Sequence, residues 1–324
     1  MIIAKELIEM AKESGADCVK FQTFSAEEFV ANQNIKFSYF SQGKKVVESE
    51  FDMLKKLEFK RSQWEEIFNY CKKLDITFLT TIQDPINLNM MVDLGLEGIK
   101  VGSDDFDHLD YLKTYVKSGL PVILSRGMAP KHEIENVINT LKPYQSAGLA
   151  ILHCISLYPT ELKFLNLNQI KTFCELYPDI IWGFSDHSQS TTIPALSVAC
   201  GARIIEKHIT LDHNLAGPDH WFSMNPSQLN EMVKNIREAE EALGKYDIVV
   251  TNEELQYKKV MRRRAIIAKD VKKGSKIQNV EVTFKRSDDG IFIESWNHML
   301  KQNLILIKDK DENDVLLKDD FTKE

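Results

Sequence analysis

The sequence between residues 180 and 210 reads IIWGFSDHSQSTTIPALSVACGARIIEKHIT. Two apolar runs in it are typical of buried parallel strands, a helical stretch separates them, and each run leads to a histidine, His187 or His208. Neighbouring strands of one barrel would raise both imidazoles at the same rim, which is how a barrel builds a metal site with open coordination positions. Alternatively, each ring satisfies a buried hydrogen bond. The repetition at successive strand ends, each beside an acidic residue, favours metal ligands.

The length of the chain predicts two domains. At 324 residues it exceeds the usual size of a single hydrophobic core, so we expect one large and one small domain. After Gly244 the pattern changes to short alternating strands separated by turn residues. We therefore predict a large domain at residues 1–245, a polar and helix-prone linker at 246–262, and a small β-rich domain at 263–324.

Charge and composition argue against nucleic-acid and membrane partners. The net charge is −7, and the basic run at residues 262–264 is typical of solvated surface or a helix end. The sequence has no apolar run long enough to span a bilayer, and its first residues lead into a helical pattern rather than a secretory signal. Five cysteines without C-x-x-C spacing favour reduced thiols and a cytoplasmic location.

Strand and helix patterns alternate through the first 245 residues. This alternation predicts an α/β fold with a parallel sheet and right-handed crossovers. A closed (β/α)8 barrel needs eight strands, whereas we count seven and the chain starts on a helix, so the expected fold is a TIM barrel missing its first strand. The predicted strands are 17–22, 76–81, 98–102, 121–125, 149–154, 180–186 and 202–209.

Two further segments carry local expectations. Residues 25–59 have no regular pattern and are predicted to form a long loop over the barrel mouth. Ser62 and Glu65 form a capping-box pattern that would open a helix ending near Leu74. Further helices are predicted from Asp84, from His108, from Lys131 and over 226–243.

Polar side chains close most of the predicted strands, where the active sites of this fold gather. Lys20 and Lys100 lie between apolar neighbours, which favours a function, although a lysine at a strand end is often a snorkelling surface side chain. With small hydroxyls they would form a cationic cup that suits a compact anion carrying phosphate and carboxylate. The strand-end residues are Lys20, Gln22, Thr80, Thr81, Lys100, Ser103, Ser125, His153, Ser156, Ser185, Asp186, His187, Glu206 and His208.

An ordered series of short motifs covers nearly the whole chain. It starts with GADCVKFQTF at residues 15–24 and reaches GPDH at residues 217–220. The series resembles the sialic acid synthase family, which includes the N-acetylneuraminate, legionaminic acid and pseudaminic acid synthases. A single motif would be weak support, whereas the ordered series is specific. The motifs between are IKVGS (99–103), ILSRGM (123–128), LHC (152–154), LYPT (157–160), GFSDH (183–187) and EKHIT (206–210).

The resemblance implies a transferase of carbohydrate biosynthesis. It would condense phosphoenolpyruvate with an N-acylated mannosamine-type or related 2-acetamido sugar, giving a nonulosonic (sialic-type) acid and phosphate. By the same resemblance, His187 and His208 would hold a divalent metal, Mn²⁺ or Mg²⁺. Two histidines suit several divalent ions, so the sequence does not select one metal.

The resemblance also implies roles for single residues. Lys20 and Lys100 would act on phosphoenolpyruvate as catalytic lysines. Beside the resemblance, a physical argument makes Asp186 the third candidate catalytic residue, because Asp186 or Glu206 would be placed to orient an imidazole. Alternatively, either one is an ordinary strand-end carboxylate. The implied substrate-binding residues are Gln22, Thr81, Ser103, Asp105, Ser125, Ser156, Tyr158 and Ser185.

The carboxy-terminal segment resembles the antifreeze-like (SAF) domain of the family. Arg286 falls at the arginine that, in the family, reaches the N-acyl group of the sugar bound to the partner subunit. The resemblance therefore implies a domain-swapped homodimer. The sequence lacks the usual proline after this arginine, since Ser287 follows it.

Departures from the family pattern are equally informative. Family members begin with a strand carrying E-x-G-x-N-H-x-G, which this sequence lacks, in agreement with the count of seven strands. If the chain begins at Met1, weak or no activity is expected. Asp105 stands where the common G-S-G-E motif of the family has glutamate, so its carboxylate lies on a shorter side chain. Ser156 stands where N-acetylneuraminate synthases often have asparagine, so the sugar need not be N-acetylmannosamine.

Two other classes of function remain open from the sequence. One is a catalytically impaired relative of the family that binds a sugar or an anion. The absence of the first strand makes this function credible. Phosphate release from phosphoenolpyruvate would separate it from a synthase. The other is a metal-dependent barrel aldolase that acts on a sugar phosphate, and phosphate retained on the product would favour it.

Overall fold

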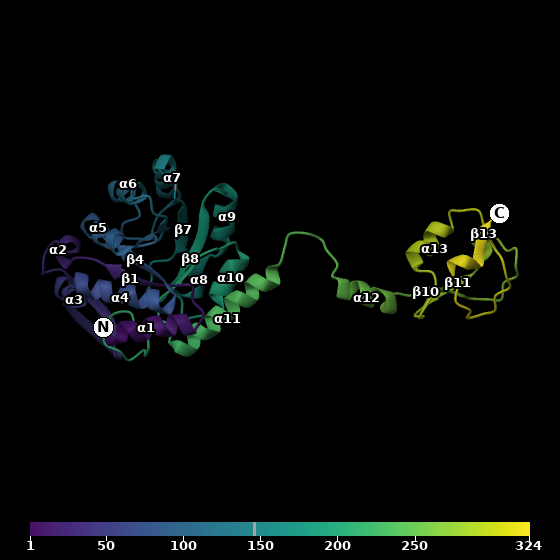
Figure 1. Cartoon of the computed structure of the whole chain (residues 1–324), viewed down its shortest axis with the longest axis horizontal. Coiled ribbons are helices and arrows are strands. Elements are labelled where there is room, and N and C mark those ends of the chain that lie inside the picture. Colours follow the sequence, from purple (N-terminus) through teal and green to yellow (C-terminus); the bar gives the residue numbers. More distant parts are fainter. Residues whose placement is uncertain (145–146) are drawn as a thin grey trace. The chain divides into compact units, whose positions relative to one another are not determined.

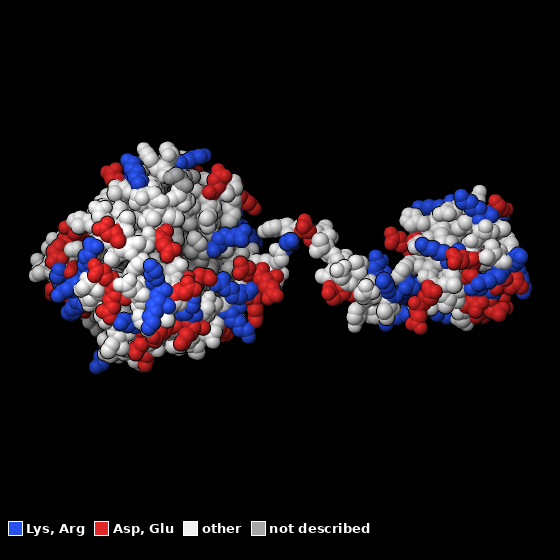
Figure 2. Space-filling view, in the orientation of Figure 1, with Lys and Arg blue, Asp and Glu red and all other residues white. Residues whose placement is uncertain are grey.

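The computed structural model describes residues 1–144 and 147–324. These residues form two compact units, Met1–Gly244 and Lys245–Glu324 (Figure 1). Acidic and basic side chains are interspersed over the visible face of each unit (Figure 2). Of the helices described, none combines the length and the apolar character needed to cross a bilayer.

The larger unit is built on a parallel sheet. Among the residues described, seven strands pair in the order β1-β4-β5-β6-β7-β8-β9, and every neighbouring pair is parallel. The predicted α/β fold with a parallel sheet is therefore confirmed. The strands are β1 (Cys18–Thr23), β4 (Thr77–Ile82), β5 (Ile99–Val101), β6 (Val122–Ser125), β7 (Leu149–Cys154), β8 (Ile181–Asp186) and β9 (Ile205–Lys207).

Helices connect the strands and cover the outer face of the sheet (Figure 1). Their apolar stripes form one core with the outward side chains of the strands, and Ile8, Ile67 and Leu112 are fully buried in it. Asp84 caps α5 by accepting a hydrogen bond from Asn87 N at 2.8 Å. The helices are α1 (Ile2–Glu13), α4 (Arg61–Leu74), α5 (Pro85–Leu94), α6 (Leu109–Lys117), α7 (Lys131–Leu141), α8 (Leu162–Leu165), α9 (Asn168–Leu176), α10 (Ile193–Ala199), α11 (Pro226–Leu243) and a 3-10 turn at Lys142–Tyr144.

Alternation along each strand decides which side chains face the inside of the curled sheet. The ladder aligns Thr81 with Lys100 and Ser185 with Glu206, so these side chains share the concave face. The intervening residues face the helices, as fully buried Val101 does. The concave face is therefore polar near the carboxyl ends of the strands, and the convex face carries the hydrophobic core.

Residues 25–59 differ from the predicted irregular loop. They contain two short helices, α2 (Ala26–Phe29) and α3 (Glu50–Leu57), and an antiparallel hairpin of β2 (Lys36–Ser41) and β3 (Lys44–Ser49). The two turn residues, Gln42 and Gly43, both have positive φ, at 52° and 73°. Such a turn matches the twist of paired strands, and glutamine is an uncommon residue in it, so the turn signal was weak.

The start of α4 also differs from the predicted capping box. The helix begins at Arg61, and its cap is Lys60 rather than Ser62. Gln63 reaches back and accepts a hydrogen bond from Lys60 N at 2.8 Å. The backbone N–H before the first turn is thus satisfied by a glutamine one turn inside the helix, without help from the serine hydroxyl.

The smaller unit, Lys245–Glu324, has a core of its own. Ala265, Ile267, Ile277 and Leu306 are fully buried in it. Two antiparallel strand pairs enclose this core, β10 with β11 and β12 with β13. Its elements are α12 (Asn252–Met261), β10 (Arg264–Ile267), β11 (Val282–Lys285), α13 (Ile293–Met299), β12 (Leu304–Leu306), β13 (Phe321–Lys323) and 3-10 turns at Ile277–Asn279 and Lys318–Asp320.

Candidate active site

Three charged side chains meet on the concave face of the sheet. Lys20 Nζ on β1 and Lys100 Nζ on β5 each lie 3.9 Å from Glu206 Oε2 on β9. Lys100 is 2 % exposed, whereas Lys20 and Glu206 are half-buried. The carboxylate therefore lies between two ammonium groups that come from different parts of the sheet.

Hydroxyl groups hold each of these charges in place. Lys20 donates a hydrogen bond to Thr81 Oγ1 at 3.0 Å, and Lys100 donates to Ser125 Oγ at 2.7 Å. Glu206 Oε1 accepts a hydrogen bond from the hydroxyl of Ser185 at 2.8 Å. The structure thus brings together five of the predicted site residues, namely Lys20, Thr81, Lys100, Ser125 and Ser185.

Burial and the neighbouring charges change the pKa values of Glu206 and Lys100. Burial alone would raise the pKa of Glu206, but Lys100 and Lys20 outweigh it and lower this pKa to about 2. Burial lowers the pKa of Lys100, and the nearby Glu206 opposes that shift. Glu206 is therefore ionised throughout the physiological pH range, and its charge helps buried Lys100 to keep its proton.

The two histidines that follow β8 and β9 lie side by side. Their ring centroids are 5.4 Å apart, and the ring of Tyr158 lies 4.1 Å from that of His187. Burial, His187 and Lys20 lower the pKa of His208 to about 3. Burial also lowers the pKa of His187, although the carbonyl oxygen of Ile155 opposes the shift. Both imidazoles are therefore neutral at pH 7.

The histidine pair has the donor chemistry of a metal site with few protein ligands. His187 Nδ1 lies 2.8 Å from the carbonyl oxygen of Ile155, which can only accept, so Nδ1 carries the proton and the lone pair of Nε2 remains for a ligand. Within residues 1–144 and 147–324, no cluster of three or more His, Cys, Asp or Glu side chains could hold a metal ion. A metal here would take two imidazoles and fill its other positions with water or substrate oxygens.

A second group of predicted residues gathers at the ends of β5, β6 and β7. The hydroxyls of Ser103 and Ser156 lie 2.9 Å apart and are hydrogen-bonded. They meet over Gly127, where a Cβ atom would stand only 2.1 Å from Ser156 Oγ. Asp105 lies close by in sequence, its Oδ2 is buried without a hydrogen-bond partner, and burial raises its pKa to about 6. A buried carboxylate oxygen without a hydrogen-bond partner lowers the free energy of unfolding, unless a ligand donates a hydrogen bond to it.

Comparison with known proteins now identifies the chain. A model of the NeuB family matches residues 7–247. The chain belongs to the NeuB family. That match spans the whole parallel sheet and both histidines.

Relatives and a solved structure agree with this family. The chain is 34 % identical over 293 residues to N,N'-diacetyllegionaminic acid synthase of Legionella pneumophila, covering 89 % of this chain and 82 % of the relative. It is 35 % identical over 245 residues to N-acetylneuraminate-9-phosphate synthase of Homo sapiens, covering 75 % and 67 %. A crystal structure of N-acetylneuraminic acid (sialic acid) synthetase from Leptospira borgpetersenii in complex with citrate is similar with a TM-score of 0.71 and 32 % identity, covering 80 % of this chain and 87 % of that one.

Three other predicted site residues of this NeuB-family chain lie outside the lysine cluster. Asp186 follows Ser185 on β8 and faces the convex side, where it forms a buried ion pair with Lys207 at 2.6 Å. Arg286 is exposed just after β11 in the smaller unit. Gln22 is exposed near the carboxyl end of β1 and aligns with Thr81 in the ladder.

The sequence reasoning missed one feature of the site and one network behind it. The sequence places Glu206 among the strand-end residues and as an alternative to Asp186 for orienting an imidazole, whereas in the structure it is the carboxylate that contacts both lysines. Behind Ser125, the buried Arg126 contacts His153 and donates to Gln169 Oε1 at 2.6 Å. An arginine directly after a strand-end serine is a usable signal for such a network, but its partner Gln169 on α9 is distant in sequence.

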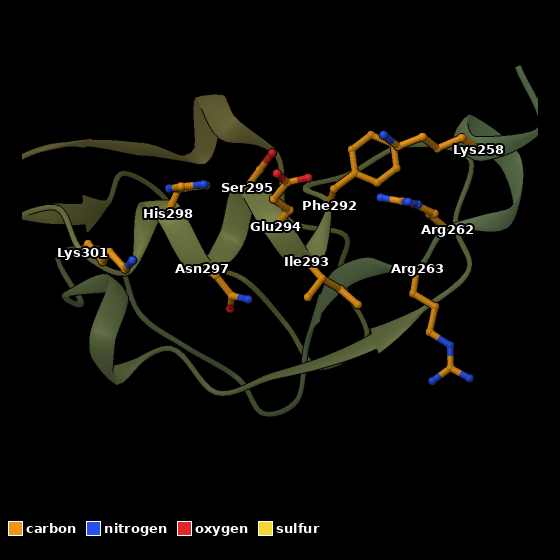
Figure 3. Close-up of a pocket in the computed structure, with 10 residues that line it drawn as sticks. All are labelled: Lys258, Arg262, Arg263, Phe292, Ile293, Glu294, Ser295, Asn297, His298 and Lys301. Carbon is orange, nitrogen blue, oxygen red and sulfur yellow. The ribbon is translucent and has the colours of Figure 1, made fainter. Parts of the chain in front are cut away.

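The smaller unit has a basic cleft of its own. The cleft measures about 690 Å³ and is lined by Lys258, Arg262, Phe292, His298 and Lys301, among others (Figure 3). Arg264 stacks on Phe292, with the guanidinium carbon 3.3 Å from the ring centroid. None of the residues predicted for the active site lines this cleft.

Proposed function

We propose that this enzyme condenses phosphoenolpyruvate with an N-acylated amino sugar to give a nonulosonic (sialic-type) acid and phosphate. Its membership of the NeuB family and its relatives, which are named as legionaminic and N-acetylneuraminate-9-phosphate synthases, support a sialic-type acid synthase. The observation that carries the proposal is the convergence of Lys20 and Lys100 on Glu206. Two neutral imidazoles stand at the ends of the neighbouring strands.

The lysine cluster supplies the site for phosphoenolpyruvate. This substrate carries a phosphate and a carboxylate on adjacent positions, so it needs two cationic contacts a short distance apart. Lys20 and Lys100 provide point charges, while Ser125, Ser185 and Thr81 provide hydroxyl donors that already bond to the same cluster. The buried setting strengthens these interactions, because little water competes for the charges.

The reaction needs one carbon–carbon bond and the release of one phosphate. C3 of phosphoenolpyruvate attacks the aldehyde carbon of the open-chain sugar, and positive charge develops at C2. Water adds at C2, and the resulting tetrahedral intermediate collapses with cleavage of the C2–O bond and loss of phosphate. Lys20 and Lys100 stabilise the charge on the departing phosphate. The negative charge of ionised Glu206 stabilises the positive charge that develops at C2 and so lowers the free energy of the transition state.

A divalent metal would be held by His187 and His208, and when bound it supplies a Lewis acid for the sugar aldehyde. Mn²⁺ and Mg²⁺ are both compatible with the proposal. We propose that Gln22, Tyr158 and Asp105 contact the sugar substrate. The Ser103–Ser156 hydrogen bond closes the same rim.

We also propose a quaternary structure and a cellular location for the enzyme. Arg286 of one subunit would contact the N-acyl group of a sugar in the barrel of its partner, within a domain-swapped homodimer. We place the enzyme in the cytoplasm, because all five cysteines are free thiols.

The test is phosphate release from phosphoenolpyruvate in the presence of Mn²⁺ and a panel of 2-acetamido sugars. We expect release that requires both substrates, together with a 2-keto acid product that lacks phosphate at C2. Turnover with the phosphate retained would overturn the proposal in favour of an aldolase. Saturable sugar binding without any release, under every metal and sugar tried, would overturn it in favour of a binding protein.

A further inference from the structure

A buried ion pair lies on the convex face of the sheet, directly behind the histidines. Lys207 Nζ on β9 lies 2.6 Å from Asp186 Oδ2 on β8, and the two side chains are 4 % and 0 % exposed. Their chain neighbours Ser185 and Glu206 face the concave side. A substrate on the concave side therefore has the sheet between itself and the ion pair, so the pair does not act on substrate directly.

The ion pair marks the last rung of the β8–β9 ladder. Asp186 and Lys207 are the final Cα partners of that ladder. One residue further along each strand stand His187 and His208. The pair is therefore the last cross-link between these strands before the chain reaches the two imidazoles.

Lys207 also holds the chain on both sides of His187. Its ammonium donates to Asp186 Oδ2 and to the carbonyl oxygen of Ser188. Asp186 accepts hydrogen bonds in return from Ser188 N at 2.8 Å and from Ser188 Oγ at 3.1 Å. These contacts fix the backbone before and after His187 relative to the residue that precedes His208.

We propose that the Asp186–Lys207 pair is a positioning pair that holds the His187 and His208 rings at their 5.4 Å separation. This inference rests on the proposed function where it concerns metal binding, whereas the spacing of the rings is a property of the metal-free protein. Stability alone does not explain a buried ion pair, because a well-packed pair of apolar side chains often stabilises a protein equally well. What the ion pair adds is a set of directional hydrogen bonds around His187.

The test compares two variants that separate positioning from stability. Asp186→Asn leaves the buried Lys207 without a counter-charge, so we expect a lower melting temperature. The double variant Asp186→Asn/Lys207→Met removes both charges, and its melting temperature should recover toward that of the wild type. If the pair positions the rings, the double variant still binds Mn²⁺ about 10- to 100-fold more weakly than the wild type, as loss of outer ligand support typically causes.

Two readouts are measured for each variant. Binding of Mn²⁺ is followed by the electron paramagnetic resonance signal of the free ion. The nuclear Overhauser effect between the ring protons of His187 and His208 is followed in metal-free protein with labelled histidine, and we expect it to weaken in the double variant. Lys207→Arg keeps the charge and the donors and should retain both signals, which covers the case in which the double variant fails to fold.

The matched control is Thr23→Val/Thr80→Val. These hydroxyls form a buried hydrogen bond of 2.7 Å on the convex face of β1 and β4, away from the histidine strands. We expect both readouts to be unchanged in this control. Wild-type Mn²⁺ affinity and ring contact in a stable double variant would overturn the inference. If the wild type itself binds no Mn²⁺, the proposed metal site is wrong, and the ring contact alone decides whether the pair positions the histidines.

Discussion

Lys20 and Glu206 come from the two edge strands of the sheet, β1 and β9, yet their charged atoms lie only 3.9 Å apart. The sheet must therefore curl until its edges approach each other across the concave face. Lys100, from the interior of the sheet, contacts the same carboxylate oxygen at 3.9 Å. One carboxylate thus contacts both lysines and favours the protonated form of Lys100, and the reaction proposed here depends on it.

Glu206→Gln should impair activity through Lys100. The glutamine keeps the size of the side chain and an acceptor for Ser185, but burial then lowers the pKa of Lys100 without an opposing charge. We expect kcat/KM for phosphoenolpyruvate to fall about 100-fold, and its alkaline limb to move to lower pH. Phosphate release measured across pH checks this. Glu65→Gln, at an exposed ion pair on α4, is the control, and equal profiles for the two variants would contradict the prediction.

Stability should also depend on pH through Glu206. Its folded-state pKa of about 2 lies below the ordinary value of 4.5, so the ionised carboxylate stabilises the folded state above pH 4.5. This contribution is of the order of 3 kcal/mol and is lost as the pH falls from 4.5 toward 2. Urea unfolding of the wild type and Glu206→Gln should therefore give free energies of unfolding that converge over this interval. A constant difference between them down to pH 3 would show that Glu206 has an ordinary pKa.

Lys100→Met should weaken the binding of phosphoenolpyruvate. The methionine fills the buried space but removes the ammonium that donates to Ser125 and contacts Glu206. We expect kcat/KM to fall by about 10²- to 10³-fold, as loss of a charge that stabilises the transition state typically causes. Lys113→Met on α6 removes a half-buried lysine whose ion pair with Asp110 is a long 3.6 Å, and it serves as the control. Similar kinetics for both variants would remove Lys100 from the site.

The strands of the larger unit were predictable because each contains a short apolar run. The run at 149–154 is buried at every position and coincides with β7, and the other predicted strands agree with the observed ones to within a few residues. Such runs are typical of parallel strands that are buried on both faces. The β2–β3 hairpin was missed because its side chains are mostly exposed, so no buried run marked it.

The identity of the strand-end residues was predictable, whereas the direction of their side chains was not. The sequence places Ser185 and Asp186 next to each other at the end of one strand, and Glu206 and Lys207 at the end of the next. A shift of one residue in the phase of a strand exchanges its two faces, so the inner carboxylate could have been Asp186 as easily as Glu206. The contacts of Glu206 with Lys20 and Lys100 decide between them.

Mixing two inactive variants tests whether Arg286 acts on the partner subunit. His187→Ala impairs the barrel, and Arg286→Ala impairs the smaller unit. In a domain-swapped dimer, mixed dimers contain one site with both residues intact, so random exchange should restore about a quarter of the wild-type activity. The measurement is phosphate release after the two variants are unfolded and refolded together, with each variant refolded alone as the control. No gain over the separate variants would show that Arg286 does not act across the dimer.

Gly127→Ala tests the rim formed by Ser103 and Ser156. The added Cβ would stand 2.1 Å from Ser156 Oγ and 2.8 Å from Ser103 Cβ, so at least one serine must move and their hydrogen bond breaks. Overpacking of this kind costs about 1–3 kcal/mol, and we expect a similar loss in the binding of substrate, seen as a KM raised about tenfold.

Gly102→Ala is the matched control for this rim. Its Cβ would meet Asp104 Oδ1 at 2.0 Å, but the three nearest atoms all belong to that one exposed side chain, which can rotate away. Neither glycine has a positive φ, so alanine fits the backbone at both positions and the comparison isolates the contact with the serines. We expect a near-normal KM for Gly102→Ala. A KM raised equally in both variants would mean that the loop backbone, and not the serine pair, shapes the substrate site.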